Sequence, residues 1–335
     1  MKILLFADTH LGFDYPIRPR IERRRRGLDF FNNYQTILDT AVSENVDVLL
    51  HGGDVFFRSK IPSLIIEKAY QPLLKVLDQG IDLFLVPGNH ERSRLPQSPL
   101  FHHPGLHLFD RPRTFIVDRG NSRIAFGGVP NIRSNVAGNI EGAIAASCLL
   151  DTKAQWRVLC LHQSIENAVV GVQNYKFRKG PDVIGLNQFP VDIDLVVSGH
   201  IHCQQVLRSS TGTPIIYPGS IERTSFAERL EKKGFYMINL SETGVEIDFR
   251  PLPCRPMIEL SLNSSMVDEA SLLKDLQSRI HELSDDAIVR IKCTSESHLG
   301  ALKIAKVRDL FPVSMNIEVA PPLSTRAHQP LAYYT

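Results

Sequence analysis

The stretch ILLFADTH, residues 3–10, sets the pattern that decides the fold of this chain. Its apolar residues have the length of a buried strand, and a carboxylate and an imidazole follow directly. The pattern recurs in VDVLLHGGD, residues 46–54, and in IDLFLVPGNHE, residues 81–91. Between these runs, apolar residues recur about every 3.6 positions up to about Glu44 and again over 64–77, which predicts helices. Strands that alternate with helices indicate an α/β domain with crossover connections.

Strands dominate the sequence after residue 114, and they predict a second sheet packed on the first. Runs of strand length, with turn residues between most of them, occupy 124–129, 158–161, 195–198, 214–217, 235–240 and 245–249.

A domain boundary is predicted where three prolines lie within residues 251–256. A small α+β unit follows, with strands expected at 257–262, 288–292 and 313–319 and helices at 271–283 and 299–311. We therefore divide the chain into domains over residues 1–253 and 254–320 and a tail over 321–335.

The composition bounds the function. The 335 residues include 38 Lys+Arg and 36 Asp+Glu, a net charge of +2, and 43% are hydrophobic. These values exclude a disordered polyelectrolyte and a protein that binds nucleic acid through bulk positive charge alone. Five widely spaced cysteines without a C-x-x-C motif favour a reducing compartment. The first apolar run is too short for a signal peptide, and no run approaches the ~18 residues of a membrane span, so we expect a cytoplasmic protein without membrane contact.

Polar side chains end five successive apolar runs, and together they predict a metal site. Ligands in open α/β sheets bind beyond the carboxyl ends of the strands, so these residues should meet at one rim. A lone histidine after a strand is more often structural, but the joint occurrence at five strand ends favours the functional interpretation. The cluster would contain five histidines, two carboxylates and one amide: Asp8, His10, Asp54, Asn89, His90, His162, His200 and His202.

The donor types and their number indicate two metal ions. Imidazole and oxygen donors together suit Mn, Fe or Zn better than Ca or Mg. Eight residues are too many for one ion, and two ions bridged by one carboxylate use the set, with Asp54 as the central candidate. Such a pair attracts a phosphate or phosphodiester and lowers the pKa of bound water.

The ordered motifs resemble those of the calcineurin-like metallophosphoesterases, and their details resemble the SbcD/Mre-type nucleases of DNA double-strand-break repair. They are DTHLG (8–12), GDVF (53–56), PGNHER (87–92), SGHIH (198–202) and YPGSIER (217–223). The resemblance covers roughly residues 1–255, and more loosely the small domain. It implies an α/β two-sheet sandwich flanked by helices, with a small C-terminal α+β capping domain.

The resemblance also implies the roles of the clustered residues. One ion, most often Mn²⁺, would be held by Asp8, His10, Asp54 and His202, and the second by Asp54, Asn89, His162 and His200. His90 matches the position that meets the phosphate without binding metal. Phe57 departs from the family pattern, in which a histidine or an acidic residue often follows G-D-x-F. His51 is expected to support the site rather than bind metal.

The family resemblance implies that the substrate is DNA, both double-stranded ends and single strands. Six arginines between residues 18 and 26 are either a solvated helix start or a contact to the DNA backbone. We take Arg23, Arg24, Arg25, Arg26 and Arg92 as the candidate DNA contacts. Lys232 and Lys233 are interpreted as a hairpin turn.

Partners and alternative functions stay open on the sequence alone. Nucleases of this type work with an SMC-like ABC ATPase, but the short, proline-punctuated stretch after the last predicted strand does not predict the usual docking helices. The sequence does not distinguish a monomer from a homodimer. Other candidates are a protein phosphatase or small-molecule phosphodiesterase, and a non-catalytic DNA-binding subunit. Asp54 is not followed by the Arg-Gly of protein phosphatases, and a scaffold has no need of His90.

Overall fold

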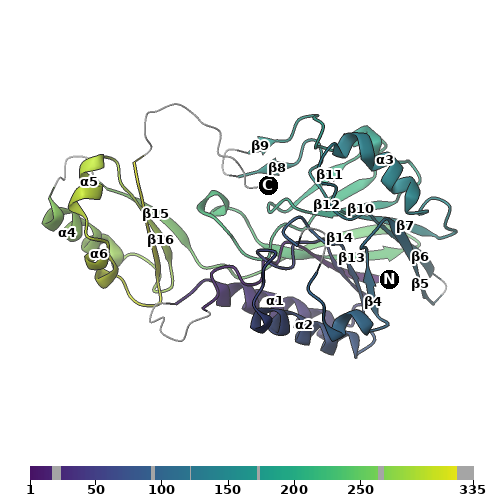
Figure 1. The fold of residues 1–335 in the computed structure, drawn as a ribbon, viewed down its shortest axis with the longest axis horizontal. Helices are drawn as coiled ribbons and strands as arrows, with labels where there is room; N and C mark the ends of the chain where they lie inside the picture. Colours follow the sequence, from purple (N-terminus) through teal and green to yellow (C-terminus); the bar gives the residue numbers. More distant parts are fainter. Residues whose placement is uncertain (17–23, 92–94, 121, 172–173, 263–267, 323–335) are drawn as a thin grey trace. The chain divides into compact units, whose positions relative to one another are not determined.

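The computed structural model describes residues 1–335 except 17–23, 92–94, 121, 172–173, 263–267 and 323–335 (Figure 1). The chain divides into two compact units. Unit 1 comprises Met1–Phe13 and Gly27–Pro253, and unit 2 comprises the described parts of Asp14–Arg26 and Cys254–Thr335. The sequence-based division placed residues 14–26 in the first domain; of these, the structure describes 14–16 and 24–26 and groups them with the second unit.

The first sheet of unit 1 has the strand order β14-β13-β1-β2-β3-β4. Its strands are β1 (Lys2–Phe6), β2 (Val48–His51), β3 (Asp82–Leu85), β4 (Leu106–Leu108), β13 (Gly234–Ser241) and β14 (Gly244–Pro251). β1 to β4 are parallel, in a register that pairs Ile3 with Val48 and Phe6 with His51. Helices α1 (Gly27–Ser43) and α2 (Ser63–Leu77) are the predicted crossovers.

The second sheet of unit 1 has the order β11-β12-β10-β7-β6-β5. Its strands are β5 (Arg113–Arg119), β6 (Ser122–Gly128), β7 (Trp156–His162), β10 (Leu195–Gly199), β11 (Gln205–Arg208) and β12 (Pro214–Tyr217). The inner strands are parallel, and β5 and β11 close the two edges in antiparallel pairing. Shorter elements are α3 (Val136–Ala146), β8 (Val169–Val170), β9 (Tyr175–Lys176) and the 3₁₀ turns Pro99–His102, Leu186–Gln188 and Phe226–Glu228.

The sequence assigned two strands to the wrong sheet. The runs 235–240 and 245–249 were expected in the second sheet, but β13 pairs antiparallel with β1 and β14 extends the first sheet. A strand's own apolar pattern does not encode which edge it joins. The connection from Tyr217 to Gly234 is long enough to carry the chain from one sheet to the other, and β13 thereby covers the open edge of β1.

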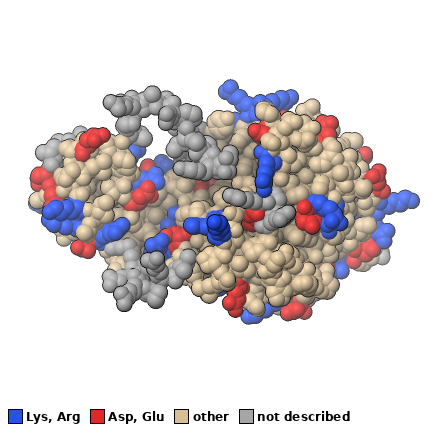
Figure 2. Space-filling view, viewed as in Figure 1, with Lys and Arg blue, Asp and Glu red and all other residues tan. Residues whose placement is uncertain are grey.

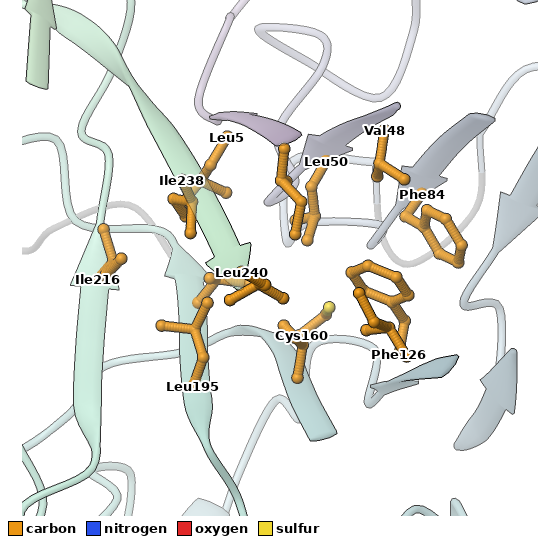
Figure 3. Packing of buried hydrophobic residues seen from close by; sticks show 14 of the residues in the cluster. Leu5, Val48, Leu50, Phe84, Phe126, Cys160, Leu195, Ile216, Ile238 and Leu240 are labelled. Atoms are coloured by element: carbon orange, nitrogen blue, oxygen red, sulfur yellow. The ribbon is translucent and has the colours of Figure 1, made fainter. Parts of the chain in front are cut away.

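The main core of unit 1 lies between the two sheets. Alternate residues of β1 to β3, such as Leu5, Leu50 and Phe84, face alternate residues of the second sheet, such as Phe126 and Cys160 (Figure 3). All five are at most 1% exposed, so strands of both sheets are fixed by packing on their inner faces. A second apolar cluster, which includes Ile140 of α3, covers the other face of the second sheet. The predicted α/β two-sheet sandwich is confirmed.

Unit 2 is built on a parallel sheet of β15 (Met257–Ser261), β16 (Ile288–Lys292) and β17 (Asn316–Ala320). Its helices are α4 (Glu269–Ile280), α5 (Glu296–Ala301) and α6 (Ile304–Leu310). The single helix expected over 299–311 is wrong, because Leu302 and Lys303 have extended backbones and Leu302 lies in the core of the unit. The chain around Arg24 joins this unit through two hydrogen bonds: its N–H donates to Val313 O, and its carbonyl accepts from Nδ2 of Asn316.

Within the described part of the chain, no helix is both long and apolar enough to span a membrane.

Candidate metal centre

The strands of unit 1 bring all eight sequence-predicted cluster residues to one place. Asp8 follows β1, Asp54 follows β2 and Asn89 follows β3, while His162 is the last residue of β7 and His200 follows β10. Because the strands within each set are parallel, their carboxyl ends coincide. Three overlapping groups of residues could each hold a metal ion, because within each group the possible ligand atoms lie within 4.8 Å of one another. The groups are Asp8, His10 and His202; His10, Asp54 and His90; and Asp8, Asp54 and His162.

Asp54 occupies the middle of the cluster. Its Oδ2 lies 3.5 Å from Nε2 of His162, 3.8 Å from Nε2 of His90 and 4.0 Å from Nε2 of His10. Its Oδ1 accepts a hydrogen bond from the backbone N–H of His90 at 3.0 Å. Burial by itself raises the pKa of Asp54, but the imidazoles of His162, His10 and His90 together outweigh it and hold that pKa far below its usual range. A buried carboxylate that stays ionised among imidazoles is placed to bridge cations.

Asn89 lies between two histidines on the side of the second sheet. Its Oδ1 is 3.0 Å from Nε2 of His162 and 3.1 Å from Nδ1 of His200. On the other side, Nε2 of His10 and Nε2 of His202 face each other at 2.9 Å. Asp8 accepts the backbone N–H of His200 with both of its carboxylate oxygens, at 3.0 and 3.1 Å.

The donor atoms of this cluster fit divalent cations. Nδ1 of His10 is buried without a hydrogen-bond partner among the described residues. In each of three groups, imidazole nitrogens and carboxylate oxygens lie within 4.8 Å of one another. Mixed nitrogen and oxygen donors at such close range suit Mn, Fe or Zn.

Three histidines of the cluster share one orientation. A carbonyl or carboxylate oxygen can only accept a hydrogen bond, so the ring nitrogen that faces it carries the hydrogen. Nδ1 of His162 faces Gly52 O at 2.8 Å, Nδ1 of His90 faces Phe57 O at 2.6 Å, and Nδ1 of His202 faces Glu228 Oε1 at 3.2 Å. In each ring, Nε2 is therefore the nitrogen that points into the cluster.

Backbone strain concentrates at the same residues. Asp8, His10, Asp54 and His200 have φ angles of 49°, 41°, 54° and 85°, in the left-handed region that costs energy for residues with a Cβ. Hydrogen bonds between the strand ends hold this geometry: Asp8 N–H donates to Gly53 O at 2.9 Å and His10 N–H donates to Asp54 O at 3.1 Å. Strain of this kind is maintained where it turns side chains toward a functional site.

Two glycines give the cluster its room. A Cβ on Gly53, whose φ is +105°, would lie 2.3 Å from Nδ1 of His162. A Cβ on Gly88 would lie 2.1 Å from Oδ1 of Asp54. Any side chain at either position would collide with a cluster residue.

His90 is one of the cluster residues with solvent access. Its side chain is 33% exposed and that of His202 is 26% exposed, whereas those of His10 and Asp54 are 1% and 3% exposed. The Phe57 carbonyl fixes its ring, and the Phe57 ring packs edge-on against Phe13, with centroids 4.8 Å apart. Any residue at position 57 would offer this carbonyl; what Phe57 adds is its ring, whose centroid lies 6.1 Å from that of the His90 ring.

Three supporting groups complete the site. His51 has partners at both ring nitrogens, because Gly53 N–H donates to Nδ1 at 3.0 Å and Nε2 lies 3.1 Å from Thr9 Oγ1. Burial lowers the pKa of His51 to about 3, which keeps the ring neutral. Glu91 accepts the N–H groups of Phe56 at 2.7 Å and Gly88 at 3.0 Å, so it ties the loops after β2 and β3 together.

The third supporting group, Glu228 with Lys233, was missed by sequence reasoning. Lys233 was interpreted as part of a hairpin turn, but its side chain is fully buried and donates to Glu228 Oε2 at 2.6 Å. Burial raises the pKa of Glu228, but Lys233 and His202 outweigh it and hold that pKa well below its usual range. Lys232 is exposed and Lys233 is buried, a difference that the sequence KK does not signal.

The candidate DNA contacts are only partly described. Arg23 and Arg92 lie outside the described residues. Arg24, Arg25 and Arg26 are half-buried and group with unit 2, and Arg25 forms an ion pair with Asp14. Among the described residues on the face in Figure 2, Lys and Arg are interspersed with Asp and Glu, in keeping with the net charge of +2.

The two-sheet sandwich and the imidazole–carboxylate cluster at its strand ends define a metal-dependent phosphoesterase. The family model of the calcineurin-like phosphoesterases matches residues 1–204, and the chain belongs to this family. The DNA double-strand break repair protein Mre11 of Saccharolobus solfataricus is 26% identical over 314 residues, which cover 91% of this chain and 74% of that protein. The Thermoplasma acidophilum Mre11 is 22% identical over 312 residues, covering 89% of this chain and 75% of that protein. The predicted homology to Mre-type proteins is confirmed.

Among solved structures, a dimetal phosphatase from Danio rerio matches 75% of this chain and 96% of its own, with 12% identity and a TM-score of 0.49.

Proposed function

We propose that this protein is a two-metal-dependent DNA phosphodiesterase that acts as an exonuclease and endonuclease in DNA repair. The observation that carries the proposal is the convergence of the donor atoms around Asp54, with His90 beside them and open to solvent. The relatives over most of the chain are named for DNA double-strand break repair, and this supports DNA as the substrate.

The distances support two sets of metal ligands that share Asp54. We assign Asp8, His10, Asp54 and His202 to one ion, and Asp54, Asn89, His162 and His200 to the other. We propose Mn²⁺ at both sites, with Fe and Zn as the alternatives that the donor types also accept. When bound, such ions would draw a phosphodiester to the site and lower the pKa of a water molecule used as nucleophile.

His90 is the side chain that we assign to proton transfer. Because its Nδ1–H is donated to Phe57 O, its Nε2 is free to hold a proton, and this nitrogen lies 3.8 Å from Oδ2 of Asp54. From there Nε2 can hydrogen-bond a phosphate oxygen or protonate the leaving oxygen. General acid catalysis of this kind contributes about 10²–10⁴-fold to the rate.

The surroundings of His90 favour a polyanionic substrate. The exposed guanidinium of Arg58 lies over the Phe57 ring, 5.5 Å from its centroid. This cation is held by the residue whose carbonyl orients His90, and we assign it a phosphate contact. Unit 2 is proposed to be the capping domain. An ATPase partner and a homodimer stay predictions, and residues 323–335 lie outside the described part of the chain.

Metal replacement tests the proposal. The protein is stripped with EDTA, reloaded with Mn²⁺, Fe²⁺ or Zn²⁺, and assayed on end-labelled linear duplex DNA. We expect Mn²⁺ to restore cleavage most strongly and Asp54→Ala to abolish it under every metal. Cleavage that persists in EDTA, or in Asp54→Ala, would contradict the proposal.

A further inference from the structure

His202 differs from the other oriented histidines of the cluster in what its Nδ1 contacts. His90 and His162 donate to neutral backbone carbonyls, whereas His202 faces the carboxylate of Glu228 at 3.2 Å. Nε2 of the same ring lies 2.9 Å from Nε2 of His10, inside the cluster. One ring therefore links a buried acidic side chain to the candidate ligand set.

Glu228 is held in place by donors around both of its oxygens. Oε1 accepts from the hydroxyl of Thr224 as well as facing His202. Oε2 accepts from Nζ of Lys233 at 2.6 Å, from the backbone N–H of Thr224 at 3.3 Å and from Oγ of Ser220 at 3.5 Å. With its carboxylate saturated and its side chain 9% exposed, Glu228 has little freedom to turn away from the imidazole.

Lys233 holds both ends of this arrangement. Its Nζ donates to Glu228, to Glu231 Oε2 at 2.8 Å and to the backbone carbonyl of His202 at 3.0 Å. A lysine with a fully buried side chain is rare unless its charge is paired, and here two carboxylates pair it. The same ammonium group therefore restrains the ring of His202 through Glu228 and its backbone directly.

We propose that Glu228, held by Lys233, is a positioning residue that fixes the hydrogen of His202 on Nδ1 and so reserves Nε2 for the metal ion. The proposal rests on the proposed function, because it takes His202 as a ligand. Carboxylates that accept the second N–H of a metal-binding histidine orient the ring and raise its basicity, and their loss costs about 10–100-fold in metal affinity.

The substitution Glu228→Gln separates this role from simple packing. Its amide oxygen would accept from Lys233, which has only hydrogens to offer, so the NH₂ group would face Nδ1 of His202. That contact selects the tautomer of His202 with its hydrogen on Nε2. An N–H group, which cannot bind a metal ion, would then face the ion in place of a nitrogen lone pair. The shape of the side chain is preserved, so the change acts on the hydrogen position.

Glu231 provides a matched control. It pairs with the same Lys233 and is similarly buried, with 11% of its side chain exposed. Of the two carboxylates, Glu228 is the one that faces Nδ1 of His202, which also lies 3.4 Å from Oγ1 of Thr224. If the acidic residues serve only to compensate the lysine, Glu228→Gln and Glu231→Gln should have equal effects. If Glu228 positions the imidazole, only the first should change metal binding strongly.

The test is calorimetric titration of the full chain with MnCl₂ after EDTA treatment. We expect Glu228→Gln to weaken binding at one of the two sites about 10–100-fold. We expect Glu231→Gln to stay within about threefold of the wild type. Equal losses in the two variants, or none in Glu228→Gln, would overturn the proposal. If Glu228→Gln does not fold, Glu228→Asp keeps the negative charge near Lys233 but withdraws the carboxylate from Nδ1 of His202, and it must show the loss instead.

A second readout needs no metal. Long-range ¹H–¹⁵N spectra of the EDTA-treated protein report which ring nitrogen of His202 carries hydrogen, with the signal assigned by its loss in His202→Asn. We expect an Nδ1–H signal in the wild type and its loss in Glu228→Gln, and identical ring patterns would refute the inference. A wild type that binds no Mn²⁺ but shows this tautomer change would instead refute the proposed function and leave the positioning role intact.

Discussion

The carbonyl oxygen of Phe57 lies 2.6 Å from Nδ1 of His90, so a cluster histidine that is open to solvent is held by a backbone group. A backbone acceptor cannot be titrated or removed by side-chain substitution, and it commits Nε2 of His90 to the open side of the cluster. The role of His90 in turnover can therefore be tested separately from metal binding.

His90→Ala should keep both metal ions and lose most of the turnover. The ring is not assigned to either ligand set, so elemental analysis should find two ions per chain, as in the wild type. Turnover on linear duplex DNA should fall about 10²–10⁴-fold because a proton donor is lost. Loss of metal from the variant would show that His90 is a ligand instead.

Asp54→Ala should deplete both ions, because Asp54 is the carboxylate shared by the two proposed ligand sets. Asp8→Ala serves as the comparison, since Asp8 is assigned to one ion and its variant should keep the other. Elemental analysis after gel filtration gives the stoichiometry of each variant. Two ions retained by Asp54→Ala would refute the bridging assignment.

Gly53→Ala should disrupt metal binding by collision rather than by strain. The new Cβ would lie 2.3 Å from Nδ1 of His162 and displace that ring. Gly80 is the matched control, because its φ is also positive, at +85°, yet nothing lies within 4 Å of a Cβ there. Gly80→Ala should cost about 1–2 kcal/mol of stability and keep wild-type Mn²⁺ affinity. Equal Mn²⁺ affinities in the two variants would show that room at Gly53 is unimportant.

Metal removal should lower the unfolding temperature. An ion that binds only the folded chain adds about 2.7 kcal/mol to the free energy of unfolding at a hundredfold excess over its Kd. The unfolding temperature should therefore be higher in MnCl₂ than in EDTA for the wild type and for His90→Ala. For Asp54→Ala, the unfolding temperatures in MnCl₂ and in EDTA should be the same. A Mn²⁺-dependent shift that survives in Asp54→Ala would place the stabilising ion elsewhere.

The arginine segment should contribute to DNA binding by neutralising backbone phosphates. Replacing Arg24, Arg25 and Arg26 with Ala should weaken binding to duplex DNA and reduce the slope of log K against log salt by roughly 0.9 for each phosphate that is no longer neutralised. The triple variant at Arg113, Arg119 and Arg123 of β5 and β6 removes the same charge and serves as the control. Equal slopes of log K against log salt in the two triple variants would show that the arginine segment makes no specific contact with the DNA backbone.

The sequence predicted the cluster well because its physical basis is local. Each strand end carries its own candidate ligand, and parallel pairing brings Asp8, Asp54 and Asn89 together. The sheet membership of β13 and the grouping of residues 24–26 with unit 2 depend on long-range pairing, which no local pattern encodes. The sequence did not predict the buried pair of Lys233 and Glu228 for a similar reason. Which lysine of the sequence KK is buried depends on the fold around it.

Substrate choice by the Mn²⁺-loaded protein tests the central claim most directly. Linear duplex DNA, circular single-stranded DNA and a small chromogenic phosphodiester are assayed in parallel, with His90→Ala as the control for contaminating nuclease. The account predicts cleavage of the linear duplex and of the circle, reduced in His90→Ala. Cleavage of the small phosphodiester alone would contradict it and identify a phosphoesterase of another substrate class.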